Sequence, residues 1–333
     1  MKKSIALLAA GVLALSAVFT GCTKDEELTK VRLNEVVHSV FYAPQYAAME
    51  LGFFEDEGLD IELSVGQGAD KSMTALISDS ADIALLGTEA GIYVYNEGRD
   101  DYCIAFTQLT QRAGNFLVSR TDEKNFKWEN LKGKELIGGR NGGMPQMILE
   151  YILKNNGIDP EKDMTLTTNI AFTSTSGAFA GGVGDYTVEF EPSATALEEA
   201  GTGYVVASLG TESGFVPYTV YMATKNYISL HPDTVQKFTN AIYRGQLWVE
   251  SHSAEEIAKV IQPHFSENSV ETLTKIIERY KSQDTWKTTP VFEKESLEHM
   301  EDIMEGAGEL DKRVDYNEFV SNVFAEEAIK NIK

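Results

Sequence analysis

The sequence predicts an α/β protein with two similar lobes, each a mainly parallel sheet flanked by helices, followed by extra C-terminal helices. Short apolar, β-branched runs alternate with helical patterns through residues 31–96, and the same alternation returns through residues 134–210. From Asp233 onward the pattern is helical. The length of 333 residues suits one large domain or two lobes with separate cores.

The first 21 residues have the composition of a secretory signal. Two lysines precede an apolar run, Ile5–Phe19, that is too short to span a bilayer comfortably. Gly21 stands directly before Cys22, which predicts a lipoprotein signal and a lipid anchor on Cys22. A plain signal peptide that happens to contain a cysteine is the alternative. Residues 22–30 are polar and would act as a tether to the folded body.

Composition excludes several classes of function. The chain has 29 basic and 51 acidic residues, a net charge of −22, and nucleic-acid binding requires a basic surface instead. We attribute the acidity to solubility. Cys103 is the only cysteine besides Cys22, so neither an internal disulfide in the mature chain nor a cysteine metal site is expected.

The first unit has a βαβαβ rhythm, which implies right-handed crossovers and a parallel sheet. Pro44 is a good first residue for a helix that stops at Gly52, and Asp70 can cap the next helix. The expected strands are at 31–37, 59–66 and 82–87, and the expected helices are at 44–52, 70–80 and around 92–95.

The second unit repeats this layout with a helix at 147–157 and another near Ala178. Its expected strands are at 134–140, 164–170, 186–192 and 204–210. Residues 73–89 and 177–193 share the order of a helix, a tight turn, an aspartate and a strand. Alignment of Asp82 with Asp185 matches Leu86–Thr88 to Glu189–Glu191. Chance in a short match is the alternative to two related lobes.

Ligands of open α/β sheets bind beyond the carboxyl ends of the strands. The candidate ligand-binding residues therefore follow the expected strands or lie in the stretches that would join the lobes. They are His38, Phe41, Tyr42, Gln45, Gln67, Gly68, Thr88, Glu89, Gln108, Arg112, Asn141, Gly142, Gly143, Met144, Thr173, Glu189, Glu191 and Tyr218.

Three glutamates among these candidates indicate the kind of ligand. Carboxylates at strand ends would repel an anion and receive amine or amide donors. Alternation along the strand places Glu189 and Glu191 on one face, so both approach the cleft or both miss it, and a solvated face is the alternative. Arg112 and Arg140 are nearby cations that could contact an anion or pair with a glutamate.

Other candidates have a simple structural alternative. His38 fits a hydrogen-bonded structural position as well as a ligand contact, and Phe41 fits the core. The glycines around Gln67 fit turn geometry whether or not a ligand binds. Residues 141–143 are not a phosphate loop, because no Lys-Ser/Thr pair follows the glycines.

Catalytic patterns are missing from the sequence. It contains no GxSxG, no HExxH and no cysteine–histidine pair with supporting spacing. The histidines, at 38, 231, 252, 264 and 299, have no metal-ligand spacing. We therefore expect a binding protein without a cofactor or metal, rather than an enzyme.

Four stretches resemble motifs of type II periplasmic-binding proteins, in the nitrate/sulfonate/taurine and thiamine-precursor branch that includes thiamine pyrimidine synthase-like proteins. They are LGFFEDEGLDIEL, LISDSADIALLG, NLKGKELIGG and GVGDYTVEFEP. The resemblance extends over nearly the whole mature chain. It implies residues 31–112 and 224–333 in lobe I, residues 113–223 in lobe II, and crossovers near 109–116 and 218–223.

The resemblance also implies a mode of action. A cleft between the lobes would close on a small molecule, and a monomer anchored to the cell membrane would deliver it to an ABC permease and its ATPase. The aromatic and glutamate candidates favour a heteroaromatic ligand such as a thiamine pyrimidine precursor. A small anion (alkanesulfonate, taurine or nitrate) is the alternative. The synthase branch uses a cysteine cluster that this chain lacks.

Overall fold

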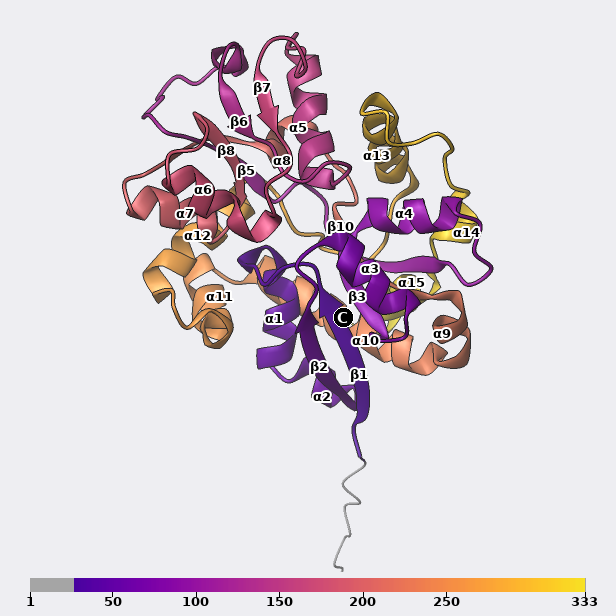
Figure 1. Cartoon of the computed structure of the whole chain (residues 1–333). Helices are drawn as coiled ribbons and strands as arrows, with labels where there is room; N and C mark the ends of the chain where they lie inside the picture. Colours follow the sequence, from indigo (N-terminus) through magenta and orange to yellow (C-terminus); the bar gives the residue numbers. More distant parts are fainter. Residues whose placement is uncertain (1–26, 333) are drawn as a thin grey trace, which may run out of the picture.

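The computed structural model describes residues 27–332, which form two lobes around two five-stranded sheets (Figure 1). The strand order is β2-β1-β3-β10-β4 in the first sheet and β7-β6-β8-β5-β9 in the second. The predicted two-lobed α/β architecture is confirmed. The expected signal peptide, residues 1–21, and the lipid anchor at Cys22 lie outside the described residues.

In the first sheet β1, β2 and β3 are parallel, and β10 is antiparallel to both β3 and β4. β1 begins within the expected tether, because Thr29 and Lys30 pair with Leu59 and Asp60 of β2. The strands are β1 (Thr29–Glu35), β2 (Leu59–Val65), β3 (Ile83–Gly87), β4 (Cys103–Thr110) and β10 (Thr219–Thr224).

The second sheet has a similar plan. β6 is parallel to β7 and β8, whereas β5 is antiparallel to β8 and β9. Its strands are β5 (Asn115–Ser119), β6 (Glu135–Ile137), β7 (Thr165–Thr167), β8 (Tyr186–Phe190) and β9 (Tyr204–Ser208).

The antiparallel strand in each sheet is a consequence of the two crossings. The chain leaves the first sheet after β4 and enters the second as β5 through residues 111–114, and it returns as β10 through residues 214–218. β5 and β10 each enter a lobe at the boundary between the two lobes, so they run away from that boundary. The strands that carry candidate residues at their carboxyl ends run toward the boundary. β5 and β10 therefore oppose their neighbours.

Helices cover both sheets. They are α1 (Ala43–Glu50), α2 (Phe53–Asp56), α3 (Ala69–Ile77), α4 (Thr88–Asn96), α5 (Met144–Asn155), α6 (Thr175–Ala180), α7 (Ser193–Glu199) and α8 (Leu209–Ser213). The prediction that Asp70 caps α3 is wrong. Gly68 is the N-cap, with φ 149° and ψ 143°, and Asp70 lies in the first turn, where a negative charge still favours the helix dipole.

The C-terminal helices contact both lobes. α10 buries Val235, Phe238, Ile242 and Val249, as the sequence pattern indicates, and packs against α1 and α15. Figure 1 shows α12 next to α7 and α13 beside α5. These helices are α9 (Lys225–Leu230), α10 (Pro232–Ser251), α11 (Ala254–Ile261), α12 (Val270–Ser282), α13 (Lys294–Gly306), α14 (Tyr316–Phe319) and α15 (Val323–Asn331).

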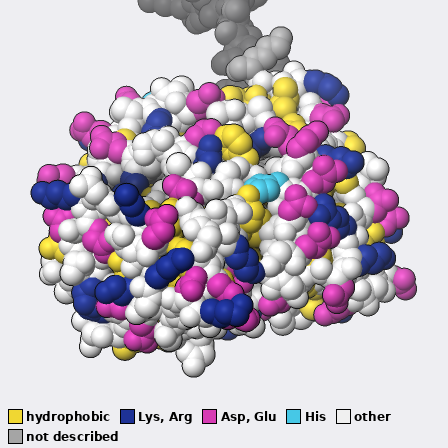
Figure 2. Space-filling view, turned by 90° about the horizontal axis from the view of Figure 1, so that it is seen from above, with side chains coloured by type: hydrophobic (Ala, Val, Ile, Leu, Met, Phe, Trp, Pro, Cys, Tyr) yellow, Lys and Arg dark blue, Asp and Glu magenta, His cyan; other side chains and the backbone are white. Residues whose placement is uncertain are grey.

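The surface carries charges of both signs, and Figure 2 shows acidic and basic side chains interspersed over one face of the molecule. Between residues 27 and 332, none of the helices combines the length and apolar character that a membrane span requires.

Candidate ligand-binding cleft

A cleft of about 270 Å³ lies where the carboxyl ends of strands from both sheets meet. The first lobe contributes residues that follow β1, β2 and β3, and the second contributes residues that follow or end β6, β7 and β8. The lining consists of Val36, Val37, Tyr42, Gln67, Gly68, Ala69, Asp70, Lys71, Gly87, Glu89, Arg140, Gly143, Met144, Pro145, Ala171, Phe190, Tyr218 and Thr219.

Three helices begin at this cleft, and each has a glycine as its N-cap: Gly68 for α3, Gly87 for α4 and Gly143 for α5. None of these three N-termini has a side-chain cap hydrogen bond. The first backbone N–H groups of a helix have no partner within the helix. The cleft is therefore surrounded by backbone donors and by the positive ends of helix dipoles.

The turn before α3 requires glycine. A Cβ on Gly66 would overlap Ser72 Oγ and approach Asn34 Oδ1 within 2.8 Å. Gln67 then adopts φ 60°, in the left-handed region. This backbone path brings the Gln67–Lys71 segment to the cleft.

Aromatic rings form the apolar part of the cleft. Tyr42, Phe190 and Tyr218 line it, and the buried ring of Phe41 packs behind them with centroid separations of 5.4 to 5.7 Å. The Tyr218 hydroxyl is buried and has no hydrogen-bond partner within residues 27–332. Flat rings with a polar group at the edge suit a planar ligand that carries polar substituents.

Glu89 is the most buried charged side chain of the lining, with 2% of its surface exposed. Burial raises the pKa of its carboxyl to about 7, although the backbone amides around Ala90 and Met144 and the charge of Arg140 oppose this effect. Its Oε2 accepts no hydrogen bond from the described residues. A buried carboxylate oxygen without a partner is stabilised by a donor that a ligand brings to it.

The two lobes also touch each other around the cleft. Arg140 Nε lies 3.8 Å from Asp70 Oδ1, and the Tyr93 hydroxyl donates to the Gly142 carbonyl at 3.0 Å. Beside the cleft the Ser39 hydroxyl donates to the backbone carbonyl of Glu191 at 2.5 Å. These contacts join the lobes in the conformation described.

The structure brings seven of the eighteen candidate residues to the cleft lining: Tyr42, Gln67, Gly68, Glu89, Gly143, Met144 and Tyr218. The other candidates lie outside the lining: His38, Phe41, Gln45, Thr88, Gln108, Arg112, Asn141, Gly142, Thr173, Glu189 and Glu191.

The two glutamates of the second lobe are buried away from the cleft, with 5% and 1% of their surfaces exposed. The alternative that they lie on a solvated face is wrong. Glu189 accepts from Thr187 Oγ1 at 2.7 Å and Thr175 Oγ1 at 3.1 Å. Glu191 pairs with Arg279 and accepts from the amide and hydroxyl of Thr195, both at 2.9 Å.

His38 and Gln45 belong to a polar network behind the cleft, centred on the fully buried Glu35. His38 Nδ1 lies 2.8 Å from Glu35 Oε1, Gln45 donates to Glu35 Oε2 at 2.8 Å, and His38 Nε2 lies 2.8 Å from the His264 carbonyl. The hydrogen bond with Glu35 raises the pKa of His38.

Other candidates support the crossings between the lobes. Arg112 Nη1 donates to the Gly210 carbonyl at 3.1 Å, and its guanidinium lies 4.0 Å from the centre of the Phe215 ring. Gln108 donates to the Thr110 carbonyl at 3.0 Å, and Thr88 donates to the Pro217 carbonyl.

Sequence reasoning missed several lining residues. Phe190 lies between the two glutamates that the alternation along β8 had selected, so the pattern marked the strand but not the face that reaches the cleft. Asp70 and Lys71 lie in the first turn of α3, a position that the predicted helix start could have identified. Val36 and Val37 end the expected strand at 31–37, and Ala171 directly follows the expected strand at 164–170, so the strand-end rule could have identified all three.

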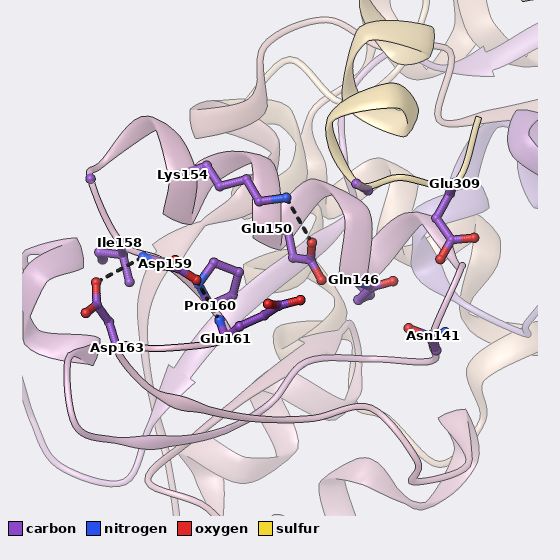
Figure 3. Close-up of a pocket in the computed structure, with 12 residues that line it drawn as sticks. Asn141, Gln146, Glu150, Lys154, Ile158, Asp159, Pro160, Glu161, Asp163 and Glu309 are labelled. Atoms are coloured by element: carbon purple, nitrogen blue, oxygen red, sulfur yellow. Dashed lines mark hydrogen bonds and ion pairs between the residues drawn. The ribbon is translucent and has the colours of Figure 1, made fainter. Parts of the chain in front are cut away.

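A second, larger hollow of about 620 Å³ lies on the outer side of α5 (Figure 3). It is open and mainly acidic. Glu150, Asp159, Glu161, Asp163 and Glu309 line it, and Lys154 pairs with Glu150 at 3.3 Å. Within residues 27–332, no group of three or more histidine, cysteine or acidic side chains has the geometry to hold a metal ion.

Comparison with known proteins assigns the family. A family model described as "NMT1/THI5 like" matches residues 40–256. The protein named "Putative binding protein YtlA" of Bacillus subtilis (strain 168) is 46% identical over 316 residues, which cover 95% of each chain. The chain belongs to the NMT1/THI5-like family.

Solved structures share the fold at low sequence identity. The alkanesulfonate-binding protein SsuA from Xanthomonas axonopodis pv. citri, bound to MOPS, has a TM-score of 0.71 at 16% identity; the match covers 89% of this chain and 99% of SsuA. The periplasmic nitrate-binding protein NrtA from Synechocystis PCC 6803 has a TM-score of 0.72 at 16% identity, with 92% and 90% covered. The fold is therefore that of periplasmic binding proteins.

Proposed function

We propose that this protein is an extracytoplasmic solute-binding lipoprotein of an ABC importer. It captures a small heteroaromatic molecule, such as a thiamine pyrimidine precursor, between its lobes, and it delivers this molecule as a monomer to the permease and its ATPase. Cys22 carries the lipid anchor. The expected lobes, residues 31–112 with 224–333 and residues 113–223, need one change: β10 (Thr219–Thr224) pairs with β3 and β4, so lobe II ends at residue 218 and lobe I resumes at Thr219. The protein acts by binding rather than by catalysis.

The observation that carries this proposal is the composition of the cleft. Rings of Tyr42, Phe190 and Tyr218 provide faces for a planar ligand, and Glu89 Oε2 provides a buried acceptor for a ring amine. A volume of about 270 Å³ is close to the lower end of the range for small-molecule pockets, about 300 to 1,000 Å³.

A small anion is the second candidate, and specific observations favour it. Three helix N-termini, Arg140 and Lys71 surround the cleft, and positive helix ends bind anions. SsuA and NrtA, which share the fold, are described as alkanesulfonate-binding and nitrate-binding proteins. The buried carboxyl of Glu89 argues against an anion in this cleft.

Isothermal titration calorimetry with 4-amino-2-methylpyrimidine, methanesulfonate, taurine and nitrate tests the proposal. We expect the aminopyrimidine to bind and to raise the unfolding temperature by mass action. Phe190→Ala should weaken binding about tenfold or more, because it removes one ring face. Tyr204→Ala is the matched control, since Tyr204 is an exposed aromatic on β9 outside the cleft.

The proposal fails if the anions bind and the aminopyrimidine does not. Mass spectrometry of a small molecule that co-purifies with the protein gives a second result, and a heteroaromatic amine is expected. Turnover of that molecule by the purified protein would contradict a role in binding alone. Replacement of Cys22 by serine should release the protein from membranes.

A further inference from the structure

The cleft has the backbone arrangement of an anion site. α3, α4 and α5 all start at it, each behind a glycine N-cap without a side-chain cap, and Arg140 and Lys71 lie beside them. Helix dipoles and N–H groups at such a point attract a negative charge. In this protein a side chain of the cleft lining supplies the negative charge.

That charge is the carboxylate of Glu89, the second residue of α4. Its side chain folds back over the start of its own helix, since a Cβ on Gly87 would overlap both carboxylate oxygens. The backbone amides of Ala90 and Met144, at the starts of α4 and α5, face this carboxylate and favour its charged form. Glu89 therefore lies at the positive helix ends, where a bound anion would otherwise lie.

We propose that Glu89 is a built-in anion that determines the selectivity of the cleft: it excludes small anionic ligands and leaves Oε2 for a ligand that donates a hydrogen bond. The second half rests on the proposed function, whereas the exclusion of anions does not. The burial of the side chain and its unpartnered oxygen distinguish this carboxylate from the solvated acidic groups elsewhere on the surface.

The other charged and titratable groups around Glu89 fit this role. Arg140 is shared with Asp70, which lies 3.8 Å from it, so the guanidinium is not fully available to a bound anion. Burial raises the pKa of Tyr42, Tyr93 and Tyr218, and the negative charge of Glu89 adds to the rise in each. Lys71 completes the charged lining.

Protonation of Glu89 should weaken the exclusion of anions. Because burial raises the pKa of Glu89 to about 7, the carboxyl is mainly ionised at about pH 8 and mainly neutral at about pH 5.5. Wild-type affinity for methanesulfonate should therefore rise as the pH falls across this range. The affinity of a Glu89→Gln variant should be insensitive to pH over the same interval.

Glu89→Gln provides the direct test, because it removes the charge and keeps the size. Calorimetry at about pH 8 should show affinity for methanesulfonate or nitrate increased about tenfold or more, since a like charge a few ångströms away is lost. Affinity for 4-amino-2-methylpyrimidine should fall about tenfold, because a charged acceptor is replaced by an amide. Glu89→Asp retains the charge and should still exclude both anions.

Glu301→Gln is the matched control. Glu301 is also 2% exposed, and burial raises its pKa, but it lies on α13 and accepts from the Val314 amide at 2.8 Å, away from the cleft. It should leave the affinity for both ligand classes unchanged. Circular dichroism and the unfolding temperature of each variant establish that it is folded.

The outcomes separate the two proposals. If Glu89→Gln is folded and gains no affinity for either anion, the built-in anion is refuted even though aminopyrimidine binding stands. If wild type binds no aminopyrimidine but Glu89→Gln gains affinity for an anion, the proposed function falls and the exclusion of anions stands. Equal, pH-independent binding of methanesulfonate by wild type and Glu89→Gln would overturn the inference.

Discussion

Glu189 should make the protein less stable as the pH rises, and Glu189→Gln should remove this effect. Only 5% of the Glu189 surface is exposed, and burial raises the pKa of its carboxyl to about 7. Hydrogen bonds from Thr187 and Thr175 oppose the rise without cancelling it. The folded state therefore binds this proton more tightly than the unfolded state, where the ordinary pKa is 4.5.

The size of the effect follows from the difference between the two pKa values. One pKa unit corresponds to 1.36 kcal/mol, so a rise from 4.5 to about 7 corresponds to about 3 kcal/mol. The stability that the Glu189 carboxyl contributes is fully present below pH 4.5, falls above it, and is lost once the pH passes about 7. Glutamine does not ionise, so the variant should be about 3 kcal/mol more stable relative to wild type at pH 8 than at pH 4.5.

Urea unfolding of wild type and Glu189→Gln at both pH values measures this difference. Glu129→Gln is the control, because Glu129 is an exposed glutamate of the same lobe. Its effect on the free energy of unfolding should be the same at both pH values. A Glu189→Gln variant that gains no stability over wild type between pH 4.5 and pH 8 would refute the reasoning.

Two further substitutions test contacts that fix the lobes. Arg279→Met should lower the free energy of unfolding by about 3 to 5 kcal/mol near neutral pH, because the buried Glu191, 1% exposed, loses its cation. Urea unfolding measures this loss, and a value below about 1 kcal/mol would contradict a structural ion pair. Tyr93→Phe should weaken ligand binding about fivefold in calorimetry, because it removes the hydrogen bond to the Gly142 carbonyl across the cleft; unchanged affinity would show that this contact does not support closure.

Local sequence patterns predicted most of the fold. Strand alternation, Pro44 and the glycine-bounded helices located seven of the ten strands, but gave no range for β4, β5 and β10 or for the helices α2, α7 and α8. Glu89 was also accessible from sequence, because it lies two residues after the end of an almost continuous apolar strand, Ile83–Gly87, and the carboxyl end of such a strand faces the cleft.

The second lobe shows why the same reasoning selected residues outside the cleft. Successive side chains of a strand point to opposite faces, so an assignment shifted by one residue exchanges the faces. On β8 the sequence selected Glu189 and Glu191, but Phe190 lines the cleft. The chemistry of the carboxylates made them the preferred ligand contacts in the sequence analysis. In the structure, packing against Phe41 and Tyr218 holds the ring of Phe190 in the cleft lining.

Long-range partners decide the remaining roles, and no local pattern encodes them. Arg279 reaches Glu191 from a helix 88 residues further along the chain. Trp286 donates to the Phe41 carbonyl at 2.8 Å, and Tyr280 donates to the Gly114 carbonyl at 2.9 Å. These contacts depend on how the C-terminal helices return across both lobes, which the sequence pattern alone does not define.

Two buried carboxylates at corresponding strand ends therefore have different roles, and their partners distinguish them. Glu191 has a cation and two donors from Thr195, so its charge is neutralised within the protein and is not available to a ligand. Glu89 lies in the cleft lining with backbone amides that face it and an oxygen without a partner, so its charge is not fully compensated within the protein. Removal of the Glu191 charge should change the stability of the fold, and it should affect ligand binding only as a consequence of that change. Removal of the Glu89 charge should instead change which ligand binds.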